Sequence, residues 1–269
     1  MGLGVLVLKA DPVAIKPFVT TGLTGPLIRA CGERHAAAVK AAILNTLDIC
    51  LNRIPQHLKP FYPQLSRSFL KAAGDPTGLA VRDQAATCLG TMATIVGARL
   101  DLNALIAGAR SGVAGQEQTT DYPDGSANAL AAVLLKSQPG SAQVEAVKAD
   151  VASLVDAAFD SSEEERFKIS IGQVMAGLAV HDAAAAKSLL ERRVLPTATD
   201  SALASNCISA LVDHTADISY DFGHAAKMAK IVSEFVFAGP AIARPAREAR
   251  EWMKTRNPWA SDDAVISVL

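Results

Sequence analysis

The sequence predicts an all-α protein built from about six consecutive helix pairs. A Lys-Pro-Phe string at residues 16–18 returns at residues 59–61, 43 residues later. Alanine is frequent and only 5% of the residues are aromatic, a mixture that suits closely packed helices. The alternating pattern of strands is absent. A period of about 40 to 47 residues is typical of stacked HEAT or armadillo helix pairs. We therefore expect a right-handed α-α superhelix, a solenoid that usually serves as a binding surface.

The first helix pair is expected before residue 55. Residues 12–31 are predicted to form a helix kinked at Pro17 and Pro26, because a proline inside a helix removes a backbone hydrogen bond. Outer helices of HEAT pairs often carry such a kink. Residues 36–54 have the clearest helical pattern, with apolar side chains at i, i+3, i+4 and i+7. Pro55 is expected to end this helix.

The second pair is expected over residues 56–73 and 79–97, and the repeat fades beyond residue 100. The polar, glycine-containing residues 113–126 are predicted to be a long loop and the only candidate hinge. The other predicted helices cover residues 101–112, 127–136, 141–159, 163–180, 181–194, 200–214, 222–237 and 244–254.

No linker divides the chain, so residues 1–269 are interpreted as one solenoid. It would contain two well-formed repeats at 12–97, more divergent pairs at 98–258 and a tail at 259–269. The net charge of −1 gives no case for binding nucleic acid or an anionic membrane. No apolar run approaches the roughly 18 residues needed to span a bilayer. Residues 2–8 are apolar but lack a basic start, so we do not interpret them as a signal peptide.

Nothing in the sequence indicates an enzyme. Motifs for phosphate binding, nucleophilic serine, zinc proteases and EF-hand calcium sites are all absent. The five histidines are scattered, and the acidic run at residues 163–165 is interpreted as a solvated helix start. We expect no catalytic, cofactor or metal site. The four cysteines show no zinc spacing and are expected to be buried, reduced thiols of a cytosolic protein; they are Cys31, Cys50, Cys88 and Cys207.

Two basic residues follow the repeat. Lys40 and Arg82 each come directly after a valine at the start of a predicted inner helix. In HEAT stacks a cation at this position typically forms a ladder with an acid in a turn. Glu33 or Asp75 would be that acid here. We interpret Lys40 and Arg82 as structural.

Other basic residues do not follow a constant 43-residue period. Arg29, for example, falls on Ala72 one period later, and neither Arg34 nor Arg67 meets another basic residue. A residue that the repeat does not require is free to contact a partner, and arginine suits a two-pronged contact with a carboxylate. Surface solubility or capping of a helix C-terminus is the alternative.

Part of the chain resembles a known family. The strings are KPFVT, GPLIR, GER, VKAAIL and LKPFYPQL, at residues 16–20, 25–29, 32–34, 39–44 and 58–65. Together they closely resemble the C-terminal HEAT region of the general control translational activator. This giant cytoplasmic protein sits on ribosomes and activates the initiation factor 2 alpha kinase during amino-acid starvation. The strong resemblance covers about residues 12–97. A weaker, collinear one follows, as at residues 243–252, and nothing is carried onto residues 108–126.

The resemblance implies a non-enzymatic docking role in the cytoplasm. In this family the region binds the N-terminal RWD domain of the kinase, and an arginine of the GPLIR string is the key contact. That position is Arg29 here. The neighbouring basic positions that match are Arg34, Lys59 and Arg67. Ribosome contact is expected only through parts of the family's full-length proteins that this chain lacks.

Two other functions remain open. A generic HEAT scaffold or adaptor, of the transport or phosphatase type, would bind a different protein through a groove lined by inner-helix residues. It would give the arginines outside the ladder no special role. An enzyme with a solenoid fold would need clustered His, Asp or Glu on inner helices, and no such cluster is evident.

Overall fold

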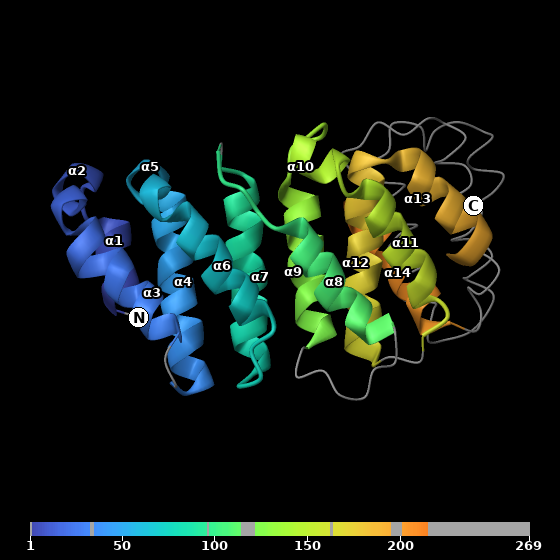
Figure 1. Ribbon diagram of the computed structural model, residues 1–269, viewed down its shortest axis with the longest axis horizontal. Coiled ribbons are helices and arrows are strands. Elements are labelled where there is room, and N and C mark those ends of the chain that lie inside the picture. Colours follow the sequence, from blue (N-terminus) through green and yellow to red (C-terminus); the bar gives the residue numbers. More distant parts are fainter. Residues whose placement is uncertain are drawn as a thin grey trace, which may run out of the picture.

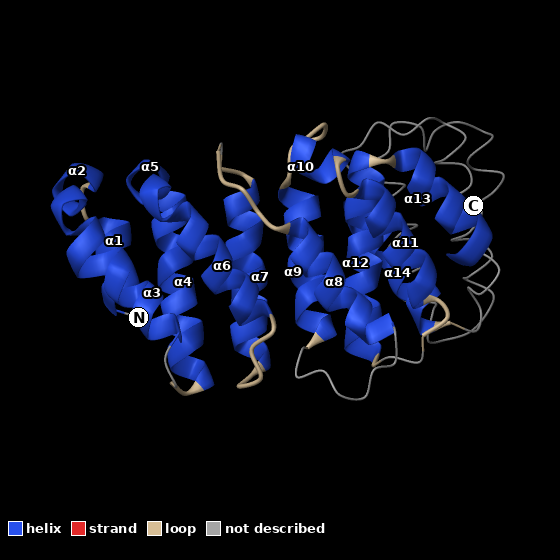
Figure 2. Cartoon of the chain, in the orientation of Figure 1, coloured by secondary structure: helices blue, strands red, loops and turns tan. Residues whose placement is uncertain are grey.

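The computed structural model describes residues 2–32, 35–95, 97–113, 122–161, 164–194 and 201–214. Within these ranges every regular element is a helix (Figure 2). The prediction of an all-α protein is therefore confirmed for the described part of the chain. The helices predicted at residues 222–237 and 244–254 and the tail lie outside it.

The first helices follow the predicted pattern with one addition. The apolar start of the chain forms a helix, α1 (Gly2–Lys9), that the sequence did not suggest. The predicted kinked helix is a continuous run of four helical segments, and Pro17 lies in its 3₁₀ turn. These segments are α2 (Pro12–Ile15), η1 (Lys16–Phe18), η2 (Val19–Thr24) and α3 (Gly25–Gly32), and α4 (Ala37–Arg53) follows.

The remaining helices alternate between two rows. Those up to residue 136 are α5 (Pro55–Leu58), η3 (Lys59–Phe61), α6 (Tyr62–Ala73), α7 (Leu79–Ala93), α8 (Leu102–Val113) and α9 (Pro123–Lys136). Those beyond are α10 (Ala142–Glu145), α11 (Lys148–Ala158), α12 (Glu165–His181), α13 (Ala183–Leu189), η4 (Leu190–Val194) and α14 (Ala202–His214).

The predicted loop at residues 113–126 is too long. Helix α8 runs to Val113 and helix α9 already begins at Pro123. Proline is favoured at the first helical position and an acid, here Asp124, in the first turn. Both residues fall within the predicted loop, although they are also signals of a helix start.

The helices form two rows that run along the molecule (Figure 1). In the inner row α1, α4, α7, α9, α12 and α14 contact one another in that order. In the outer row α3 contacts α6, α8 contacts α11, and α11 contacts α13. Outer helices also pack on inner ones, as α6 does on α7 and α8 on α9. Each helix pair is therefore covered mainly by its neighbours along the chain.

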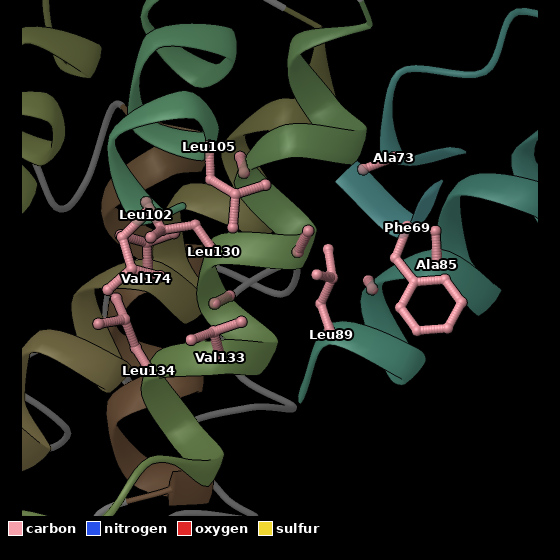
Figure 3. Packing of buried hydrophobic residues seen from close by; sticks show 14 of the residues in the cluster. Phe69, Ala73, Ala85, Leu89, Leu102, Leu105, Leu130, Val133, Leu134 and Val174 are labelled. Atoms are coloured by element: carbon pink, nitrogen blue, oxygen red, sulfur yellow. The ribbon is translucent and has the colours of Figure 1, made fainter. Parts of the chain in front are cut away.

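The core lies between the rows and uses small side chains for close approach. Leu89 of α7 is fully buried and lies in the space between α7 and α9, near Val133 (Figure 3). At Gly90, one residue further, a Cβ atom would lie 3.0 Å from the backbone oxygen of Ala132. The low aromatic and high alanine content thus matches helices whose backbones nearly touch.

The first outer helix contains one residue more than the second. Lys16 precedes its repeat partner Lys59 by 43 residues, whereas Gly32 precedes Gly74 by 42. The π-helical turn η2 accommodates the extra residue in the first outer helix. At the corresponding place in the second outer helix, α6 is a regular α-helix. A π-turn is a one-residue bulge that such an insertion produces. Gly25 ends the bulge, and a Cβ atom there would lie 2.8 Å from the carbonyl oxygen of Thr20.

A constant 43-residue period is therefore wrong beyond the bulge. With a spacing of 42, the buried Thr24 matches the buried Ser66, and Arg29 matches Lys71. With a spacing of 43, the exposed Arg29 would match Ala72, which is only 5% exposed. Arg29 thus does follow the repeat, as a cation on the surface of the outer row.

We expect Thr24→Val to raise the free energy of unfolding by about 1 kcal/mol, because the substitution removes a buried hydroxyl that has no hydrogen-bond partner among the described residues. Urea denaturation followed by circular dichroism measures this change. Thr20→Val, at an exposed position of the same turn, serves as the control and should change stability by less than about 0.5 kcal/mol. A loss of stability in Thr24→Val would show that the hydroxyl does contribute.

Candidate docking surface

An ion pair joins α4 to the turn that follows α6. Lys40 Nζ donates a hydrogen bond to Asp75 Oδ2 at 2.6 Å, and the side chains are 11% and 12% exposed. Burial alone would raise the pKa of the Asp75 carboxyl, but hydrogen bonds from Lys40 and Thr77 hold the pKa below its usual value. This pair lies where the repeat places a ladder contact, and Asp75 is one of the two acids suggested by the sequence.

Arg82 has a different carboxylate partner. Its Nη1 donates to the backbone carbonyl of Asp75 at 3.2 Å, and its Nη2 donates to Asp124 Oδ2 at 3.2 Å. Its guanidinium also lies over the ring of Tyr122, 4.3 Å from the ring centre. The sequence suggested Glu33 or Asp75 as the acid. Glu33 lies outside the described residues, and Asp124 was missed because its segment was taken as a loop.

The ladder residues of the inner row are spaced by 42. Lys40, Arg82, Asp124 and Arg166 follow one another at this interval. Arg166 Nε donates to Asp124 Oδ2 at 3.0 Å, and its Nη2 donates to Asp83. Helices α7, α9 and α12 are thereby joined by one charged network. The spacing of 42 was the signal in the sequence that could have extended the repeat beyond residue 100.

The outer helices of the first two pairs carry cations and no acids. Residues 12–32 and 55–73 contain no Asp or Glu. Their five Lys and Arg side chains are all exposed, and in the described residues none of them forms an ion pair. Further along the outer row several cations are paired, as Arg110 is with Asp150. We call these five residues the basic face: Lys16, Arg29, Lys59, Arg67 and Lys71.

Three members of the basic face lie on adjoining helices. Arg67 and Lys71 are four residues apart on α6 and so share one side of that helix. Arg29 lies on α3, which contacts α6. The 42-residue spacing matches Arg29 with Lys71, so the two residues occupy corresponding positions of adjoining helices. Lys59 lies in η3, about 12 Å from Arg67 along the helix axis. Arg34 lies outside the described residues.

Lys71 is not among the contacts predicted from the sequence. The residue stood out neither by motif nor by period, because the bulge displaces its partner Arg29 by one position. Lys71 lies in the last turn of α6 and Arg29 in the last turn of α3, where a cation also interacts favourably with the helix dipole. Aligning the two helices on Gly32 and Gly74 would have revealed the pair.

The cysteines and the possible metal ligands define no second site. Cys50, Cys88 and Cys207 are buried, whereas Cys31 is partly exposed and so differs from expectation. Burial raises the pKa of all four thiols, that of Cys50 to about 12. Across the described ranges, no three His, Cys, Asp or Glu residues converge as metal ligands do. None of the helices described is long and apolar enough to cross a membrane.

In the part of the chain that the structure describes, the fold and the surface define an all-α protein of paired helices, with a basic face on its outer row whose cations form no ion pair there. No family model matches the chain. The chain is 45% identical over 87 residues to the eIF-2-alpha kinase activator GCN1 of Saccharomyces cerevisiae. It is 43% identical over 94 residues to the stalled ribosome sensor GCN1 of Mus musculus, and 43% identical over 95 residues to Protein ILITYHIA of Arabidopsis thaliana.

These matches cover 32%, 35% and 35% of the chain, and 3% of each relative. The chain therefore spans a very small part of the length of these curated relatives. About a third of it is related to GCN1 proteins.

Proposed function

We propose that this chain is a non-enzymatic docking segment that binds the RWD domain of the initiation factor 2 alpha kinase through its basic face. The observation that carries the proposal is the absence of acids from two neighbouring outer helices, whose five cations form no ion pair within the described residues. Such a surface favours a partner that offers carboxylates. Arg29 is the central contact, with Lys59 and Arg67 beside it, and Arg34 is proposed from the sequence alone.

The proposed architecture is a right-handed HEAT-type solenoid. Two observations support it. Successive helices of each row contact one another in chain order, and a charged residue recurs at the same position of the inner helices every 42 residues. In a solenoid each pair contacts only its neighbours, so a long side of the molecule stays accessible for a partner. The basic face lies on the outer row of the first two pairs.

The proposed role is recruitment in the cytoplasm. One of the relatives is named as a kinase activator and another as a ribosome sensor. A segment that holds the kinase near the ribosome raises the kinase's effective concentration there without any new catalytic group. Ribosome contact itself is assigned to parts of a larger assembly and not to these residues. Opposite charges on the two surfaces would also speed their association.

The test is a pull-down and a titration of the purified chain with the kinase's RWD domain. Arg29→Ala should weaken binding at least tenfold, since a hydrogen bond between charged groups contributes about 1.5 to 3 kcal/mol. Circular dichroism of Arg29→Ala should match the wild type. Lys136→Ala is a matched control, because Lys136 is also exposed in the last turn of its helix but lies on the inner row.

Three results would contradict the proposal. If Arg29→Ala unfolds the chain, the residue is structural. If Lys136→Ala weakens binding equally, the effect is one of overall charge. If the wild type does not bind the RWD domain, a generic HEAT scaffold with a different protein partner becomes the better assignment.

A further inference from the structure

A cavity of about 300 Å³ lies beside the basic face. The C-terminal ends of α3 and α6 form one side of it, and the first turns of α4 and α7 contribute the other. A water molecule occupies about 30 Å³, so the cavity can hold one acidic side chain together with several waters. Its lining residues are Cys31, Gly32, Lys40, Ser68, Lys71, Ala72, Asp75, Pro76 and Val81.

The charges around this cavity favour an anion. Lys40 and Asp75 neutralise each other through their ion pair. Lys71 is exposed and has no ion pair in the described part of the chain, so it leaves a net positive charge at the cavity. Arg29 adds a second cation at the rim, because it lies one turn before the lining residue Gly32.

The partial charges of the helix ends around the cavity largely cancel one another. The last turns of α3 and α6 present carbonyl groups and a partial negative charge, whereas the first turns of α4 and α7 present N–H groups and a partial positive charge. The side chains therefore decide the sign. Ser68, one turn before Lys71 on α6, adds a hydroxyl that can donate a hydrogen bond.

We propose that this cavity receives the carboxylate of a partner's Asp or Glu side chain, bound by Lys71 and flanked by Arg29. The identity of the partner rests on the proposed function. The carboxylate preference of the cavity does not, because it follows from the residues that line it. Lys71 is thereby assigned a role in binding that neither the ladder nor the predicted contacts gave it.

Cys31 allows the cavity to be tested without a partner. It lines the cavity and is partly exposed, whereas the other three cysteines are buried. Iodoacetate carries a carboxylate and iodoacetamide is its neutral analogue. The Cys31 thiolate attacks the CH2 carbon of either reagent and displaces iodide, so the raised pKa of Cys31 cancels in the ratio of the two rates. Mass spectrometry of the folded protein gives the rate of modification at this residue.

The ratio of the iodoacetate rate to the iodoacetamide rate at Cys31 should exceed that of the uncharged thiol 2-mercaptoethanol about fivefold, as expected for one nearby unit charge. Lys71→Ala and Lys71→Met should each return it toward the 2-mercaptoethanol value, and Lys136→Ala should leave it high. A wild-type ratio at or below that of 2-mercaptoethanol overturns the proposal. So does a high ratio that both Lys71 variants leave unchanged.

The second experiment separates this proposal from the proposed function. The RWD domain should protect Cys31 from iodoacetamide, and Lys71→Ala should weaken its binding several-fold. If the domain binds but leaves Cys31 fully reactive, docking stands and the cavity is not the carboxylate site. If the domain does not bind, the proposed function fails, and the ratio of alkylation rates alone decides whether the cavity attracts carboxylates.

Discussion

Asp124→Ala is expected to lower the free energy of unfolding by about 3 kcal/mol. Asp124 accepts hydrogen bonds from both Arg82 and Arg166, and its side chain is 12% exposed. Without the carboxylate, the guanidinium of Arg82, whose side chain is 11% exposed, stays buried and loses its counter-ion. The carbonyl of Asp75 and the ring of Tyr122 remain as partners and limit the loss.

Urea denaturation measures this effect, and Arg110→Ala provides the comparison. The Arg110–Asp150 pair also joins two neighbouring helices, but its side chains are 45% and 54% exposed. Breaking an exposed pair should cost less than about 1 kcal/mol. If Asp124→Ala costs no more than Arg110→Ala, the charged network contributes little and the ladder is not a structural device.

Gly125→Ala should lower the free energy of unfolding by about 3 kcal/mol. Replacing glycine by alanine inside a helix normally has the opposite effect and raises the free energy of unfolding by up to about 1 kcal/mol. A Cβ atom at residue 125 would collide with the backbone carbonyl of Ala73 and lie 2.7 Å from Cδ of Arg82. Ala73 is the last residue of α6, and its backbone cannot move without displacing that helix.

The matched control for this variant is Gly32→Ala. Gly32 is also helical and exposed, and no atom of the other described residues would lie within 4 Å of a new Cβ there. Its substitution should be neutral or stabilising. Thermal and urea denaturation of both variants distinguish the effects of packing and propensity. A gain in stability for Gly125→Ala would mean that α9 can move away from α6 at little cost.

Asp124→Ala and Gly125→Ala both change the first turn of α9, where the inner row meets the end of α6. The basic face lies on the exposed side of the outer row. Variants that remain folded at the temperature of a binding assay should therefore retain affinity for the partner. Substitutions at Asp124 and Gly125 are thus expected to lower stability without weakening docking. Substitutions at Arg29 and Lys71 are expected to weaken docking without lowering stability.

Local patterns in the sequence were enough to predict most helices. The spacing of apolar residues predicted α4 at residues 36–54, close to its bounds Ala37–Arg53. The proline-kinked helix before it was also predicted, since a proline and an apolar stripe are visible in the chain itself. The start of α9 was missed because proline, aspartate and glycine signal a turn as readily as a helix N-terminus.

What the sequence determined by itself is the helical class, the presence of a repeat and the residue types of the basic face, since these are visible along the chain. The tertiary structure decided three other features. The bulge at η2 set the register that pairs Arg29 with Lys71. The packing of α9 on α7 gave Arg82 its carboxylate partner, 42 residues away. The meeting of four helix ends formed the cavity beside Lys71. Each depends on how separate helices fit together, and contacts between distant residues follow from packing and not from local sequence.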